Sequence, residues 1–140
     1  MISQLTVFLQ NEKGRLASAC RTIADANINM HALFHADTQD FGVARIFCDT
    51  PAEAARVLND AGFRATVTPV IAVRVPDEPG GLAGLLEFCD ENAMNVEYGY
   101  CFNANGEYAV DVLKIEGDEA EGKLVEGGFT IVRPEEIYAE

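Results

Sequence analysis

Two short stretches of the chain combine residue types that suit the binding of a small charged molecule. The first, N-E-K-G-R-L, covers residues 11–16, and the second, D-E-P-G-G-L, covers residues 77–82. Each places glycine just before a predicted helix, where unpaired backbone N–H groups and the positive end of the helix dipole favour a carboxylate. Glycine also lets a ligand approach the backbone closely. The side chains of Asn11 and Asp77 can accept hydrogen bonds from an ammonium group. The pattern therefore indicates recognition of an α-amino acid or a similar small molecule.

The two stretches differ in charge, and the difference predicts different ligands. Lys13 and Arg15 make the first cationic, whereas Asp77 and Glu78 make the second anionic. A guanidinium at a helix start strengthens the binding of a carboxylate by a charge-assisted hydrogen bond. We therefore expect the first turn to prefer acidic ligands and the second to prefer neutral or cationic amino acids.

The remaining reactive side chains do not form a catalytic or metal-binding pattern. His31 and His35 are the only histidines, and on a strand they would stand about 13 Å apart, too far to chelate one metal ion. Ser3 and Ser18 have no base nearby in the sequence. The four cysteines show no C-x-x-C spacing and are expected to fill the core; they are Cys20, Cys48, Cys89 and Cys101. We predict no enzyme activity, no metal and no cofactor.

The charge distribution argues against nucleic acid as a partner. The formal net charge is −13, with −1 in residues 1–70 and −12 in residues 71–140. Phosphate binding needs lysine and arginine, so the second half would repel it. An acidic surface serves solubility, and an alternative is a footprint for a basic protein partner. No apolar run approaches the roughly 18 residues of a membrane helix, and no signal peptide is evident. We expect a cytoplasmic protein that binds no membrane.

An internal repeat determines the predicted fold. At a constant offset of 66 residues, Gly14 aligns with Gly80, Leu16 with Leu82, and the pair Gly62-Phe63 with Gly128-Phe129. Further matches are Val7 with Val73, Asn29 with Asn95, and Leu58 with Leu124. The glycine positions and the apolar phase are both preserved over nearly the whole half-chain. We therefore divide the chain into repeats at residues 1–68 and 69–140.

Each repeat shows the same order of predicted elements. Alternating apolar residues predict a first strand, and a glycine turn and an amphipathic helix follow. A second strand and a third strand then form a hairpin, and Asn105-Gly106 is a strong turn signal in the second repeat. A second helix begins near Thr50-Pro51 and ends at Gly62, with Thr50 expected as its cap. A short last strand completes a β-α-β-β-α-β order, the ferredoxin-like plan, in an α+β fold with antiparallel sheets and helices on one face. With almost no linker, the two repeats are expected to pack together.

The turn N-x-x-G-x-L, followed about fifteen residues later by asparagine at the start of the second strand, resembles the ACT domain family. The resemblance covers both repeats and identifies the chain as a free-standing tandem ACT domain protein. ACT domains are regulatory modules that commonly bind amino acids where two domains associate. The resemblance implies ligand contacts at the two turns and at one asparagine per repeat from the adjacent domain; these residues are Asn11, Gly14, Arg15, Leu16, Asn29, Asp77, Gly80, Gly81, Leu82 and Asn95.

Other interpretations stay open at this point. Gly14 and Gly80 could serve only a tight turn, and Asn11 and Asp77 could only cap a helix. The chain could instead be a non-catalytic assembly subunit of an amino-acid metabolic enzyme, acting through protein contacts. A base-stacking sheet for RNA is disfavoured by the charge and because the aromatic phase of the second strand is expected to pack under the helices; that phase comprises Tyr98, Tyr100 and Phe102.

The sheet face away from the helices predicts the oligomeric state. We expect it to carry Thr6, Phe8, Leu33 and Phe47, which is too apolar for a face left in water. The other repeat or a second chain would cover it. We predict contact between the repeats and a homodimer.

Overall fold

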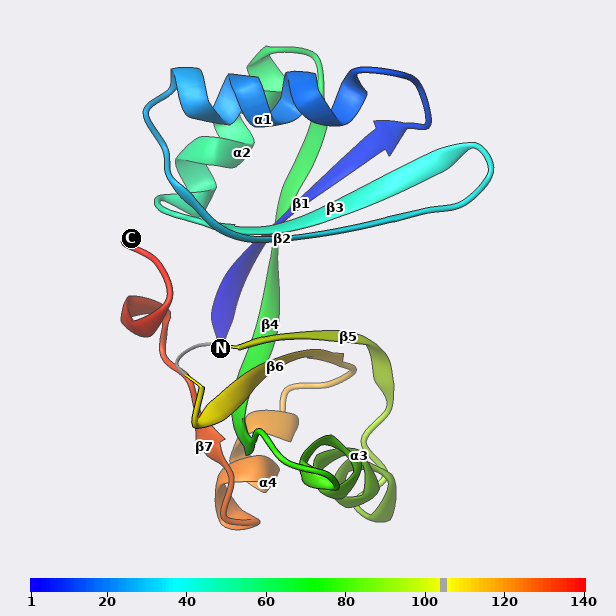
Figure 1. Ribbon diagram of the computed structural model, residues 1–140, viewed down its shortest axis with the longest axis vertical. Coiled ribbons are helices and arrows are strands. Elements are labelled where there is room, and N and C mark those ends of the chain that lie inside the picture. Colours follow the sequence, from blue (N-terminus) through cyan, green and yellow to red (C-terminus); the bar gives the residue numbers. More distant parts are fainter. Residues whose placement is uncertain (104–105) are drawn as a thin grey trace. The chain divides into compact units, whose positions relative to one another are not determined.

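The computed structural model describes residues 1–103 and 106–140. It confirms two β-α-β-β-α-β repeats, followed by a short 3-10 helix (Figure 1). The elements in order are β1 (Ile2–Gln10), α1 (Arg15–Asp25), β2 (Met30–Asp37), β3 (Phe41–Cys48), α2 (Pro51–Asp60), β4 (Arg64–Pro76), α3 (Gly81–Glu91), β5 (Val96–Asn103), β6 (Tyr108–Ile115), α4 (Ala120–Glu126), β7 (Thr130–Ile131) and η1 (Pro134–Glu136).

The chain forms two compact units. The first unit contains Ser3–Thr68 and Pro134–Glu140, and the second unit contains Met1–Ile2 and Pro69–Arg133. The strand β4 has 13 residues and serves as the last strand of the first repeat and the first strand of the second. The last seven residues, which the division by sequence counts with the second repeat, pack with the first unit. None of the helices in the described residues is long and apolar enough to cross a membrane.

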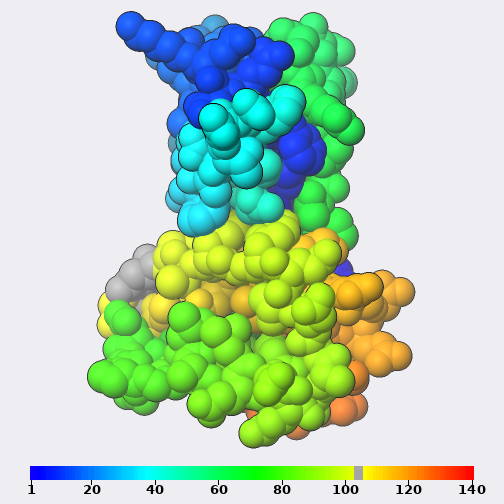
Figure 2. Space-filling model, turned by 90° about the vertical axis from the view of Figure 1, so that its right-hand side faces the viewer, coloured from blue at the N-terminus to red at the C-terminus, as the bar shows by residue number. Residues whose placement is uncertain are grey.

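The first unit has its core between an antiparallel sheet and two helices. The strands β2 and β3 pair, as do β3 and β1, and α1 and α2 cover one face of this sheet (Figure 1). Alternate residues of β1 point into the core, where Ile23 of α1 and Leu58 of α2 are fully buried. The amphipathic spacing of the helices therefore faces the sheet as the sequence predicts. Figure 2 shows α1 in blue and the β2–β3 hairpin in cyan.

The second unit repeats this plan with β4, β6 and β5 as neighbouring strands and β7 on the other side of β4. Its core joins alternate residues of β4 to Leu85 and Cys89 of α3 and Leu124 of α4. Two of the four cysteines, Cys48 and Cys89, are buried as predicted. Cys101 is exposed, so the prediction of a core role is wrong for that residue, which lies on a strand at the edge of its sheet.

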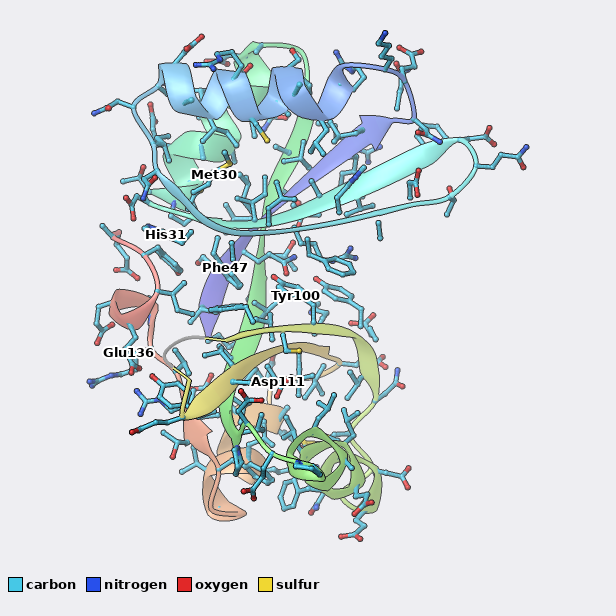
Figure 3. The ribbon with its side chains drawn as sticks, viewed as in Figure 1. Met30, His31, Phe47, Tyr100, Asp111 and Glu136 are labelled. Atoms are coloured by element: carbon cyan, nitrogen blue, oxygen red, sulfur yellow. The ribbon has the colours of Figure 1, made fainter. Side chains whose placement is uncertain are left out.

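A β-bulge lies at the start of the second strand in both repeats. The register shifts between Met30 and Ala32 in β2, and between Val96 and Tyr98 in β5. An extra residue at a bulge moves the following residues to the opposite face of the sheet. Figure 3 shows the change in the first repeat, where the Met30 side chain lies on the helix side and those of His31 and Phe47 lie on the other.

The bulge corrects two predictions about sheet faces. Tyr98, Tyr100 and Phe102 pair with Lys114, Val112 and Val110. They therefore lie on the face away from the helices, and Figure 3 shows Tyr100 on that side. Their predicted packing under the helices is wrong. Likewise Leu33 pairs with Ile46 of the helix-side core, so it does not belong to the opposite face with Thr6, Phe8 and Phe47.

The helix ends agree with the sequence except at one cap. Pro51 occupies the first turn of α2, and Gly62 follows its end with a left-handed φ of +92°. Thr50, however, has φ 42° and its side chain makes no capping hydrogen bond, so the predicted cap is wrong. Ala104 and Asn105, part of the predicted hairpin turn, lie outside the described residues.

The C-terminal segment is anchored to the first unit by three polar contacts and one ring. The Thr50 N–H donates to the Ala139 carbonyl at 2.7 Å, and the Ala139 N–H donates to Asp49 Oδ1 at 2.7 Å. The latter bond, with a smaller contribution from His31, lowers the pKa of Asp49. The Tyr138 ring stacks on Phe47 with centroids 6.3 Å apart, and its hydroxyl accepts from the Ser3 N–H. Tyr138 is 4% exposed, so its ring is the main apolar anchor of this segment.

The anchoring predicts different costs for two substitutions at Tyr138. Tyr138→Ala removes the stacked ring and should lower the free energy of unfolding by about 3 kcal/mol. Tyr138→Phe keeps the ring and loses one hydrogen bond, so its cost should be about 1 kcal/mol. Urea unfolding followed by circular dichroism measures both. Small and equal losses would mean that the segment detaches before the unit unfolds.

Candidate functional site

A pocket of about 530 Å³ lies beside the first turn. The end of β1, the start of α1, the start of β3 and the segment before β4 build it. Its lining residues are Phe8, Leu9, Gln10, Arg15, Phe41, Gly62, Phe63 and Arg64. Aromatic rings and two guanidinium groups therefore surround one space, which suits a small molecule with an apolar body and a negative charge.

Arg15 is the predicted site residue that the structure brings into this pocket. It is the half-buried first residue of α1, and its guanidinium carbon lies 4.4 Å from the centre of the Phe63 ring. Its Nε is buried and has no hydrogen-bond partner. A buried donor without a partner costs free energy that a ligand oxygen would recover. Arg64 approaches from β4, with its guanidinium carbon 5.4 Å from the Phe8 ring centre.

Gly14 and Gly80 shape the two turns through their backbone conformation. Their φ angles are +87° and +88°, in the left-handed region that favours glycine. A Cβ on either residue would meet no atom within 4 Å. The conformation alone therefore explains the glycines, and the open space beside them leaves the backbone accessible.

Asn11 and Leu16 have structural contacts instead of lining this pocket. The Asn11 amide Nδ2 donates to the Gln39 carbonyl at 3.2 Å and ties the turn to the β2–β3 hairpin. No side chain caps α1, so Asn11 does not act as a helix cap. Leu16 packs against the core of the first unit.

The second turn has a different construction. A Cβ on Gly81 would lie 2.2 Å from the Pro76 carbonyl oxygen, so a close backbone approach requires glycine there. Asp77 contributes its charge to the surroundings of the Cys101 thiol, and Leu82 lines a separate cavity. No side chain caps α3 either.

Asn29 and Asn95 precede the second strands and are exposed. Each accepts a hydrogen bond through its backbone carbonyl, from the Asp49 N–H at 3.0 Å and from the Glu116 N–H at 3.3 Å. These bonds hold the end of the third strand of each repeat. The asparagine side chains stay predicted ligand contacts.

The pair of guanidinium groups belongs to the first repeat alone. At the 66-residue offset, Gly81 replaces Arg15 and Thr130 replaces Arg64. Both positively charged residues that line the pocket therefore have uncharged counterparts in the second repeat. Reasoning from the sequence misses Arg64 because only the pairing of distant strands brings it near Arg15. The signal was the repeated Gly62-Phe63 pair, which precedes Arg64.

The histidines do not join a metal site. The His31 Nε2 is hydrogen-bonded to Asp49 Oδ1 at 2.7 Å. Across residues 1–103 and 106–140, no three histidine, cysteine, aspartate or glutamate side chains gather in a way that could hold a metal ion.

Comparison with known proteins agrees with this architecture. Residues 1–135 match the family model of the ACT domain pair. The chain belongs to this family. It is 32% identical to protein BT0572 from Bacteroides thetaiotaomicron, whose structure has a TM-score of 0.89 over 96% of this chain and 94% of that one. No curated protein sequence matches it.

Two more distant structures share the fold of the ACT domain pair. The regulatory subunit of aspartate kinase from Thermus thermophilus has a TM-score of 0.67 at 16% identity, with 90% of each chain covered. The corresponding subunit from Thermus flavus has a TM-score of 0.63 at 16% identity, with 88% of each chain covered. These likenesses confirm the fold of two ACT repeats.

Replacing glycine by alanine at the start of α3 and inside it should have opposite effects on stability. Gly81→Ala places a methyl group against the Pro76 carbonyl and should destabilise the protein by about 1–3 kcal/mol. Gly84→Ala lies inside α3 with open space around it and should stabilise it by up to about 1 kcal/mol. Thermal unfolding of both variants tests the close approach. A stabilising Gly81→Ala would contradict it.

Proposed function

We propose that this ACT domain pair is a non-catalytic regulatory protein that binds a small carboxylate-bearing ligand, an amino acid in the simplest case, in the pocket beside the first turn. The observation that carries the proposal is Arg15, whose buried Nε lacks a partner while its guanidinium rests on Phe63. Arginine suits this role because its planar group stacks on a ring and binds a carboxylate at the same time.

The surroundings of Arg15 give the ligand an orientation. Its carboxylate meets the Arg15 guanidinium at the start of α1, where the helix dipole adds a favourable contribution. Its apolar part lies against Phe8 and Phe41, which are 42% and 62% exposed. Arg64 provides a second positive charge for a ligand with an additional acidic group. The first turn should therefore select acidic ligands with an apolar part.

ACT domains act as regulatory modules, and the Thermus structures with this fold are regulatory subunits of aspartate kinase. We propose that the ligand changes the association of this chain with itself or with a metabolic enzyme. The alternative, an assembly subunit that binds no ligand, predicts that no amino acid raises its melting temperature.

Substitution of Arg15 tests the ligand class directly. Arg15→Gln should weaken binding of glutamate and aspartate about tenfold or more, because a charge-assisted hydrogen bond contributes roughly 1.5–3 kcal/mol. Neutral amino acids carry the same α-carboxylate and should lose about as much, so the ratio of acidic to neutral affinity should stay close to its wild-type value. Isothermal titration of both variants measures the ratio. The matched control is Lys13→Gln, which removes one charge from the same exposed turn outside the pocket. An equal loss of affinity in both variants would mean that Arg15 acts only by long-range electrostatic attraction.

The homodimer is a separate proposal that light scattering can test. The first unit exposes Phe8 and Phe34 on strands, at 42% and 40%. Exposed aromatic rings of this kind favour burial by a second chain. We expect the mass of a dimer at micromolar concentration, and a monomer at that concentration would exclude it.

A further inference from the structure

The second unit contains a cavity that none of the predicted turns explains. It has a volume of about 310 Å³ and lies between the start of α3 and the edge strand β5. Figure 2 shows α3 in green beside β5 in yellow-green on this face. Its walls come from Leu82, Leu86, Gly99, Cys101, Asp111 and Leu113, among others. Val96 and Tyr100 complete the lining, so the polar side-chain groups of the wall are a carboxyl group, a thiol and a phenol.

Asp111 is the one charged residue in the wall, and it is 3% exposed. It pairs with Cys101 across the strands and lies on the helix side of β6, as Figure 3 shows. The Cys101 thiol donates a hydrogen bond to the carboxyl group. Asp111 Oδ2 is buried and has no hydrogen-bond partner. Burial raises the pKa of Asp111, and only the bond from Cys101 opposes this shift.

The first repeat shows that the fold does not need this carboxylate. Asp111 pairs with Val73 and Cys101, and the residue in the same register of the first repeat is Ala44, which pairs with Val7 and His35. Ala44 is fully buried in an apolar core. The same strands therefore pack well with a methyl group at that position.

The space in front of Asp111 has a similar origin. Gly99 pairs with Leu113, and in the first repeat the corresponding residue, Leu33, pairs with Ile46. A Cβ on Gly99 would already lie 2.9 Å from Leu113 Cδ2. The second repeat thus loses a leucine side chain where it gains a buried carboxylate. The lost leucine side chain provides space, and the carboxylate provides a polar group beside that space. A binding cavity needs both.

We propose that this cavity binds a small primary ammonium group carried on a short apolar chain, with Asp111 Oδ2 as its acceptor. A carboxylate removed from water costs several kcal/mol unless a partner compensates it, and an ammonium group supplies both the charge and the hydrogen bond. The apolar walls from Leu82 and Leu86 accommodate the carbon chain. This site is independent of the carboxylate pocket in the first unit.

The geometry favours an ammonium group over two other cations. A guanidinium group binds carboxylate through both oxygens, and here the thiol already uses the carboxyl group. A divalent metal ion such as Ca²⁺ needs six or more oxygen ligands, and the wall offers a single carboxylate. An ammonium group is a compact donor that needs one well-placed acceptor.

The pH dependence follows from the groups around Asp111. Cys101 on β5 pairs with Asp111 and donates to its carboxyl group, and the charge of Asp77 acts on Cys101. Since a carboxyl group with a raised pKa holds its proton longer in the folded state, its protonated form stabilises the fold at low pH. That contribution is lost as the pH rises from about 3.8 through the raised value. Ionisation at higher pH should in turn strengthen ammonium binding.

Titration with n-butylamine tests the proposal, with 1-butanol and butyrate as matched probes of equal chain length. Amide chemical shifts of Gly99 and Cys101 in a nitrogen-15 spectrum report on the cavity itself. We expect butylamine to bind at neutral pH, and at least tenfold more weakly to Asp111→Asn. The alcohol and the acid should not reproduce its shifts. Equal binding of butanol, or equal binding of butylamine to Asp111→Asn, would overturn the proposal.

Two controls separate this result from changes in folding and from the first site. Asp111→Asn keeps the shape of the side chain and removes a buried charge, so its melting temperature at pH 7 should rise. The exposed Asp90→Asn carries the same change of charge on α3 and should leave amine binding unchanged. Arg15→Gln should also leave it unchanged, so failure of either site can be recognised independently. Loss of amine binding in Asp90→Asn to the same degree as in Asp111→Asn would contradict the assigned acceptor.

Discussion

The β-bulge in the second strand of each repeat determines which side chains face the helices. A strand alternates strictly, so one extra residue reverses the assignment of every residue after it. In β2 the bulge follows Met30, and in β5 it follows Val96. Without it, Tyr98 and Tyr100 would crowd the space under α3. With it, Gly99 and Cys101 occupy that side, and a cavity exists. The presence of the bulge at equivalent positions shows that it is a property of the fold and that the two repeats differ in what they place behind it.

The two repeats use one scaffold for charged groups of opposite sign, one half-buried and one fully buried. In the first, the Arg15 guanidinium lies on the Phe63 ring. In the second, the Asp111 carboxyl lies among aliphatic side chains and a thiol. Neither charge is needed for the fold, because Gly81 stands at the position of Arg15 and Ala44 at the register of Asp111. A charge that the fold does not need and that costs desolvation free energy is a sign of a binding role.

The repeat made the fold predictable from the sequence. Matching Gly14 with Gly80 and Leu16 with Leu82 placed both turns and both helices, and the order of elements followed. The faces of the second strand were not predictable in this way. In a strand, the alternate positions that carry apolar residues are expected to face the core. Tyr100 and Phe102 occupy such positions but lie on the opposite face. The missing information is the bulge, which depends on pairing with the next strand and leaves no mark in the hydrophobic pattern.

The candidate site residues also differ in whether the local sequence is enough to predict them. Arg15 was predictable because a guanidinium beside a helix start favours a carboxylate there, and both features can be recognised from neighbouring residues. Arg64 and Asp111 were not, because each acquires its role from strands distant in sequence. The contact between Asn11 and Gln39 was not predictable either: the Asn11 amide donates to the Gln39 carbonyl in the β2–β3 hairpin, while its predicted ligand contact stays a prediction. A short motif therefore identified the region of the first pocket, and tertiary contacts decided which side chains line it.

The surroundings of the two charges also imply that their sites respond differently to pH. An aromatic face compensates part of the desolvation of a cation, by about 0.5–2 kcal/mol, and a guanidinium group is not deprotonated in proteins. The Phe63 ring therefore offsets part of the cost of removing the Arg15 guanidinium from water. The walls around Asp111 give a carboxylate no such compensation, and the thiol of Cys101 offsets burial only in part. The second site consequently exists in a neutral and a charged form, and an ammonium ligand selects the charged one. Binding at the second site must then release the proton of Asp111 whenever that proton is bound.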